Sequence, residues 1–146
     1  MKLIACMPAK DIYHEIVKTS LEKDGWTITH APYFIRLGIR KGYIDLGAER
    51  ILIGAEKESE KIVVEVKSFI GKSDLDDFKE AVGQFLIYLF ALSEMNSQRV
   101  LYLAVSANFY ARFFEDAFFT RLTTQYKINL LVFDIEQTIL TQWIIK

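Results

Sequence analysis

Residues 61–68 of the chain read Lys-Ile-Val-Val-Glu-Val-Lys-Ser, a β-branched run that predicts a buried strand. Alternate side chains of a strand point to opposite faces of its sheet, so Val63, Glu65 and Lys67 share one face. An ionised side chain moved from water into a protein interior is costly unless it is paired. We therefore expect Glu65 and Lys67 to face a cleft, to form a pair or to bind a metal ion.

A second acid interrupts an apolar segment upstream, where Asp45 lies inside a strand predicted over residues 41–47. The carboxylates of Asp45 and Glu65 are the hard oxygen ligands that Mg²⁺ and Mn²⁺ prefer, and the carbonyl of Val66 would complete the set. Lys67 would orient or help to deprotonate a water molecule. This combination is typical of metal-assisted hydrolysis of a phosphodiester.

The rest of the chain predicts an α/β fold. The first half holds one helix and a run of strands, and the second half alternates helices with strands, which favours parallel pairing. The predicted helices span 9–23, 74–96 and 108–127, the last possibly broken near Asp116, and the predicted strands span 26–30, 41–47, 49–57, 61–69, 99–106, 128–135 and 138–145. We expect a three-layer domain whose mixed β-sheet is flanked by helices.

Composition limits the classes of protein that the chain can represent. Its 146 residues suit one domain, and 51% hydrophobic residues can build a core. No apolar run is long enough to span a membrane, and the single cysteine excludes an internal disulfide. We expect one cytoplasmic domain over residues 1–146, with residues 1–6 as an N-terminal tail. The net charge of −1 means that any contact with DNA uses a local basic patch or a basic partner.

Three residues on the predicted helices have two interpretations each. Gln84 and Tyr88 share a helix face and would either face the mouth of the cleft or form a polar pair on a buried helix. Glu15, on the first helix, would join the metal ligands or belong to a solvated face, and its polar neighbours on the helix favour the solvated face.

Three basic residues precede Asp45, in what the sequence predicts to be a loop. Arg36, Arg40 and Lys41 would contact phosphates that flank the scissile bond, or would simply keep a turn soluble. The sequence slightly favours the phosphate contacts, so these residues are the predicted DNA-binding set, with Tyr88 as a further member.

The order Asp45, nineteen residues, then Glu65-x-Lys67 resembles the motif of the PD-(D/E)XK nuclease superfamily. Ile44 occupies the position of the proline in the superfamily's name. Gln84 and Tyr88 match the Q-x-x-x-Y spacing of the RecB-like branch. The resemblance implies that Asp45, Glu65, Lys67 and Gln84 are catalytic, with Mg²⁺ or Mn²⁺ as cofactor.

Longer blocks, including "MPAKDIYHEIVKTSLEKDGWTITHAPY", "YIDLGAERILIGAEK" and "GQFLIYLFAL", resemble the XisH family from Met7 to about Trp143. The family is described as controlling excision of the fdxN DNA element, on a restriction-endonuclease-like fold and often with a small XisI-like partner. The resemblance implies a metal-dependent DNA endonuclease-like factor in DNA excision. The alternative is a catalytically inactive accessory that binds DNA or a partner protein. The resemblance to the XisH family also implies that Met7, in place of Met1, is the usual start of the chain.

The helix over 74–96 and the aromatic segment over 109–119 hold more apolar side chains than a small domain buries easily. Large exposed apolar patches mark interfaces. We therefore expect either a homodimer or a complex with a small XisI-like protein.

Overall fold

The computed structural model describes residues 8–52, 59–71 and 73–146, so the predicted tail over residues 1–6 and both possible starts lie outside the described residues. The elements follow the order of helix, strands, then alternating helices and strands. They are α2 (Ala9–Lys23), β1 (Thr27–His30), β2 (Tyr33–Leu37), β3 (Arg40–Ile44), β4 (Leu46–Ile51), β5 (Ser59–Val66), α3 (Asp74–Glu94), β6 (Val100–Ser106), α4 (Ala107–Phe113), α5 (Ala117–Gln125), β7 (Leu130–Asp134) and β8 (Ile139–Ile144).

A six-stranded mixed sheet forms the centre, in the order β1-β4-β5-β6-β7-β8. Strands β5, β6 and β7 are parallel, and the remaining pairs are antiparallel. The predicted antiparallel pairing of the first half is thus confirmed, and the predicted parallel pairing of the second half holds for β5, β6 and β7 but not for β8. The register places Leu46 opposite Val64, which brings the start of β4 beside the end of β5.

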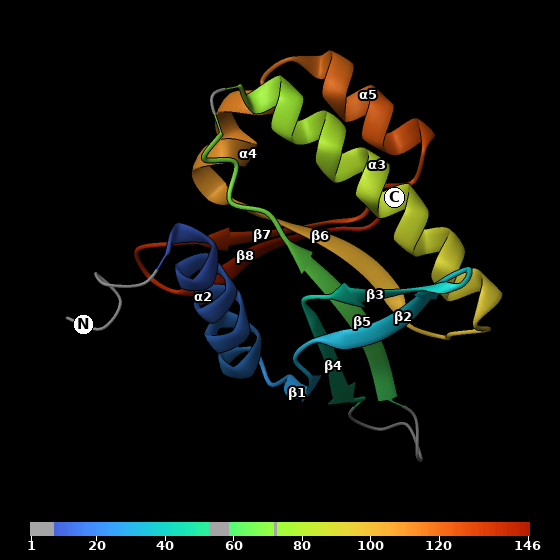
Figure 1. The fold of residues 1–146 in the computed structure, drawn as a ribbon. Coiled ribbons are helices and arrows are strands. Elements are labelled where there is room, and N and C mark those ends of the chain that lie inside the picture. The colour runs from blue at the N-terminus through green and yellow to red at the C-terminus, as the bar shows by residue number, and fades with distance from the viewer. Residues whose placement is uncertain (1–7, 53–58, 72) are drawn as a thin grey trace.

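Helices cover both faces of this sheet and give three layers (Figure 1). One face packs against α2 through buried side chains that include Ile62 and Val64. The other face, which carries Val63, packs against α3, α4 and α5. The alternation predicted for β5 is confirmed, and it directs Glu65 toward the side of α3.

Two helix boundaries show their causes. The Ser73 hydroxyl accepts a hydrogen bond from the Asp76 N–H at 3.2 Å and caps α3. Asp116 accepts from the Phe118 N–H at 3.0 Å and caps α5, so the predicted aromatic helix is broken there into α4 and α5. The first turn of α3 also carries Asp74, Asp76 and Asp77, which suits the helix dipole.

The region before Asp45 corrects the sequence prediction. Arg36, Arg40 and Lys41 belong to strands of a hairpin, in place of the predicted loop, and β2 and β3 form a separate two-stranded sheet. The predicted strand over 41–47 is divided at Asp45, because β3 ends at Ile44 and β4 begins at Leu46. The basic side chains disguise the hairpin, since Arg36 and Lys41 occupy its outward face while Ile35 and Ile44 are fully buried.

Among the described residues, no helix combines the length and the apolar character that crossing a membrane requires.

Candidate active site

Asp45 and Glu65 hold each other's segments through two crossed hydrogen bonds. The Val66 N–H donates to Asp45 Oδ2 at 2.8 Å, and the Asp45 N–H donates to Glu65 Oε1 at 3.2 Å. The break between β3 and β4 makes this possible, because it frees the Asp45 N–H from the strand ladder. Each acid therefore reaches the backbone that carries the other, and both lie at one end of β5.

The carboxylates of Asp45 and Glu65 lie close together, so they repel each other when both are ionised. Glu65 is only 8% exposed. Burial, and next to it the nearby charge of Asp45, raise the pKa of the Glu65 carboxyl to about 8, while Lys67 acts in the opposite direction. Lys67 lies at 4.0 Å, Nζ to Glu65 Oε2, so its ammonium only partly offsets the pair's repulsion.

These residues line one cleft of about 450 Å³. Of the predicted set, Asp45, Glu65, Val66, Lys67 and Gln84 all line it. A second hollow of about 260 Å³, next to α2, is also lined by Asp45 and Val66, so Asp45 is accessible from two sides. The arrangement brings the predicted catalytic residues into one place.

The pair Gln84 and Tyr88 is joined, as its spacing allows, by a 2.7 Å hydrogen bond from Gln84 Nε2 to the Tyr88 hydroxyl. Tyr88 is 9% exposed and belongs to the core, and burial is the main cause that raises the pKa of its hydroxyl. This placement suits support of Gln84 more than contact with DNA. Gln84 Oε1 is buried and has no hydrogen-bond partner in the part of the chain that the structure describes, which leaves an acceptor at the cleft.

The cleft is also lined by five residues that the sequence analysis did not assign to it, namely Lys10, Tyr13, Ser68, Ile70 and Glu80. Glu80 precedes Gln84 by four residues, and this spacing on α3 is a signal that could have identified it. Lys10 and Tyr13 come from α2, and only the packing of that helix on the sheet brings them here. His14 of the same helix lies 3.5 Å from the Asp45 carbonyl through Nε2.

The segment after Lys67 is held in an unusual conformation. Phe69 has a φ of 50°, in the left-handed region that bulky side chains rarely adopt. Its ring stacks on Phe109 of α4, with centroids 3.6 Å apart and planes 12° apart. The helical layer therefore fixes the backbone two residues beyond Lys67.

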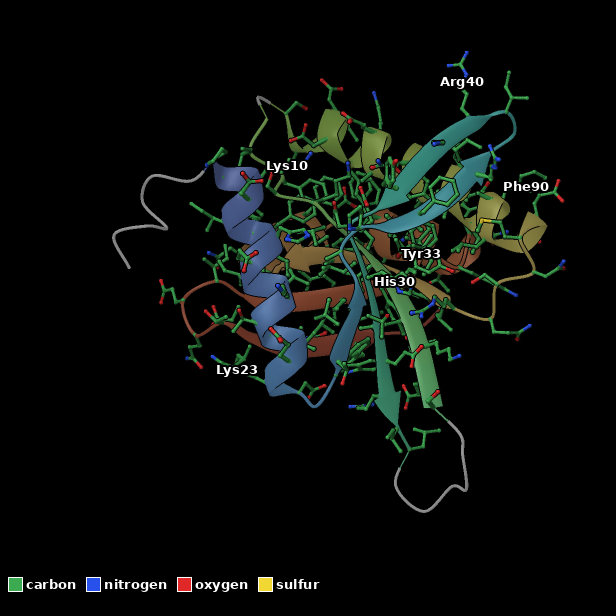
Figure 2. The ribbon with its side chains drawn as sticks, turned by 60° about the horizontal axis from the view of Figure 1, so that its bottom comes forward. Lys10, Lys23, His30, Tyr33, Arg40 and Phe90 are labelled. Atoms are coloured by element: carbon green, nitrogen blue, oxygen red, sulfur yellow. The ribbon has the colours of Figure 1, made fainter. Side chains whose placement is uncertain are left out.

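The remaining predicted residues lie outside the cleft. Glu15 is exposed, with its Oε1 3.9 Å from His14 Nδ1, and it does not line either hollow at Asp45. Arg36, Arg40 and Lys41 are exposed on the hairpin. Figure 2 shows Arg40 at the turn of the hairpin, directed away from the body of the molecule.

The residues at the cleft fit Mg²⁺ or Mn²⁺. Two close carboxylates, one of them buried and reluctant to ionise, supply oxygens that a cation would stabilise. Within the described ranges, no group of three or more His, Cys, Asp or Glu side chains could hold a metal ion. The pair accords with the usual mode of Mg²⁺, which binds one or two carboxylates together with waters and substrate phosphates.

Comparisons with known proteins give consistent results. A family model described as "XisH protein" matches residues 7–141. The crystal structure of an XisH family protein from Nostoc punctiforme has a TM-score of 0.83 and 41% identity, covering 92% of this chain and 99% of that one. That of an fdxN element excision controlling factor protein from Anabaena variabilis has a TM-score of 0.81 and 40% identity, covering 92% and 98%. No curated protein matches the chain.

Proposed function

Because the chain belongs to the XisH family, we propose that it is a metal-dependent DNA endonuclease-like factor that controls excision of a DNA element. The proposal assigns the fold to the restriction-endonuclease-like PD-(D/E)XK group. The observation that carries it is the convergence of Asp45, Glu65, Lys67 and Gln84 on one cleft. The relative from Anabaena variabilis, named for control of fdxN element excision, supports the biological setting.

In this proposal each cleft residue has a role. Asp45 and Glu65 would hold Mg²⁺ or Mn²⁺, with the Val66 carbonyl as a further oxygen. The bound ion supplies polarisation of the phosphate and a lowered pKa of the attacking water. Lys67, as an ammonium, would donate a hydrogen bond that positions that water, and Gln84 would offer its unpartnered Oε1 to a donor on the substrate or on a water molecule.

The partner proposal rests on a groove between β2 and the C-terminal half of α3. It is lined by Leu37, Leu86, Ile87, Phe90 and Met95 among others, and measures about 760 Å³. Phe90 is 66% exposed and Ile87 is 57% exposed. Exposed apolar surface of this kind favours a homodimer or a complex with a small XisI-like protein in the cytoplasm, and it is the observation that favours an accessory role.

A cleavage assay separates the two roles. Linear, nicked and branched DNA would be incubated with the protein in Mg²⁺, in Mn²⁺ or in EDTA, with and without an XisI-like partner. Lys67→Ala should reduce cleavage by at least about a hundredfold, the usual contribution of a positioned acid–base group. Lys61→Ala is the matched control, because Lys61 lies near the start of β5, the strand that leads to Lys67, and its Nζ is 3.9 Å from Glu49 Oε1.

The outcomes are distinct. Metal-dependent cleavage that is lost in Lys67→Ala and kept in Lys61→Ala supports the nuclease. Cleavage that persists in Lys67→Ala, or no cleavage of any substrate in either metal, contradicts it and favours the accessory role.

A further inference from the structure

The β2–β3 hairpin is anchored on one side only. Ile35 and Ile44 are fully buried against the core on the side of α3, and Gly42 lies against the side chains of Ile35 and Leu37. The hairpin pairs only with itself, as a two-stranded sheet apart from the central one. Its second face therefore has no covering layer in the described structure.

That uncovered face carries two cross-strand pairs of defined chemistry. Phe34 lies opposite Tyr43, with ring centroids 5.9 Å apart, and the two are 41% and 53% exposed. Arg36 lies directly opposite Lys41. Like charges at opposed positions of an antiparallel pair are destabilising, so this face carries an electrostatic cost that a bound polyanion would offset.

No acid in the described structure forms an ion pair with these cations, although Glu94 lines the same groove as Arg36. The chain holds no Asp or Glu between Asp24 and Asp45, although the whole sequence is slightly acidic. Arg36, Arg40 and Lys41 make no ion pair among the described residues, whereas Arg50, Arg99 and Arg112 each do. Residues 25–44 are therefore a stretch of local positive charge in a slightly acidic chain.

The tip of the hairpin is apolar. Gly38, with a φ of 64°, begins a two-residue turn, and Ile39 at its apex is 96% exposed. Five residues of β3 separate this tip from Asp45, a length of about 17 Å at the rise of a strand. A basic two-stranded ribbon is thus joined directly to the acid of the cleft, and it ends in a bare β-branched side chain.

We propose that the β2–β3 hairpin is a DNA-binding arm, whose basic face contacts the backbone of duplex DNA and whose tip, Ile39, inserts between base pairs and bends the duplex. This deepens the proposed function and rests on it, since it names the element that holds the DNA substrate. Two-stranded ribbons fit DNA grooves, and apolar wedges unstack base steps and kink the duplex by roughly 20–90°. Arg36 and Lys41 supply backbone contacts, and Phe34 and Tyr43 supply flat surfaces for sugars or exposed bases.

The first test measures the affinity for duplex DNA at several salt concentrations, in EDTA so that no cleavage occurs. Removing Arg36 and Lys41 together, as Ala, should weaken binding and reduce the slope of log affinity against log salt by about two, since each phosphate contact contributes close to one. The matched control removes Lys79 and Arg121, which are exposed cations on α3 and α5. The control should keep the wild-type slope.

The second test measures bending, through energy transfer between dyes at the two ends of a short duplex. The wild-type protein should bring the ends together, and Ile39→Ala should abolish the bend while leaving the salt slope unchanged. Ile145→Ala, at another isoleucine that is 70% exposed, should bend DNA as the wild type does. If the double variant at Arg36 and Lys41 fails to fold, Lys41→Ala alone tests the same claim at one exposed residue, with an expected reduction of the slope by about one.

The proposal is overturned if the hairpin double variant keeps the wild-type slope, if the control pair loses as much affinity, or if the wild-type protein leaves DNA unbound or straight. In the first case the hairpin face serves a protein partner. Hairpin-dependent binding without cleavage would contradict the nuclease proposal alone, and cleavage that ignores the hairpin variants would contradict the arm alone.

Discussion

Replacing Glu65 with Gln should stabilise the metal-free protein at neutral and alkaline pH. The Glu65 carboxyl is buried beside Asp45, and this environment raises its pKa to about 8. An amide keeps nearly the same shape and keeps an oxygen to accept the Asp45 N–H, now 3.2 Å away. It carries no charge, so the repulsion and the desolvation of the ionised form both disappear.

The size and sign of the effect follow from the two pKa values. The Glu65 pKa is 4.5 without the protein environment and about 8 in the folded state. Within that window the unfolded chain releases a proton that the folded chain retains. The free energy of unfolding that protonated Glu65 contributes is therefore largest below pH 4.5, and it falls as the pH rises to about 8. At about 1.4 kcal/mol per pH unit, the wild type loses about 3 kcal/mol by pH 7, or a melting temperature lower by roughly 6–12 °C.

Urea unfolding in EDTA, from about pH 5 to about pH 8, measures this directly. The free energies of unfolding of wild type and Glu65→Gln should nearly meet at the acid end and separate steadily toward the alkaline end. Glu80→Gln, at an exposed acid of the same cleft, should follow the wild type. Parallel profiles for wild type and Glu65→Gln, or a wild type that gains stability toward pH 8, would refute the reasoning.

Two further predictions address the metal site and the sheet. We expect Mg²⁺ at a hundredfold excess over its dissociation constant to stabilise the wild type by about 2.7 kcal/mol and so to raise its melting temperature, and Asp45→Asn should remove this rise. Equal shifts in both proteins by differential scanning fluorimetry would argue that Asp45 is structural. Arg99→Ala should lower the free energy of unfolding by about 3 kcal/mol, because the largely buried Arg99 side chain donates to two strand carbonyls and to Glu49. Lys61→Ala, which removes only an exposed partner of Glu49, should lower it by less than about 1 kcal/mol, and similar losses in both variants would contradict this account.

The parts of the fold that follow from local pattern were predictable. The run of β-branched residues before Glu65 makes β5 by itself, and Ser73 followed by acids fixes the start of α3. Alternation within β5 also placed Glu65 and Lys67 on one face. These predictions needed no knowledge of any other segment.

The parts of the fold that depend on contacts between distant segments could not be predicted from the sequence. Strand β2, and with it the β2–β3 pairing, was missed because only one face of the hairpin is buried, and the outward Arg36 makes β2 resemble a soluble loop. Strand β3 was predicted as the start of a longer strand over residues 41–47. Lys10 and Tyr13 reach the cleft because α2 packs on the sheet, and the hydrophobic periodicity of the sequence does not predict where a helix packs. The interruption between β3 and β4 at Asp45 depends on where β4 pairs with β5. The sequence therefore predicts one strand where the structure has two.

The left-handed backbone at Phe69 makes the chemistry of the cleft vulnerable to changes in a layer that contains none of it. Such a conformation costs about 1–3 kcal/mol, and the stack on Phe109 of α4 is what offsets it. A substitution that loosens this stack would let the segment relax to an ordinary conformation and carry Lys67 with it. Substitutions in α4 can therefore displace Lys67 from the cleft in a related sequence that still contains every residue of the cleft.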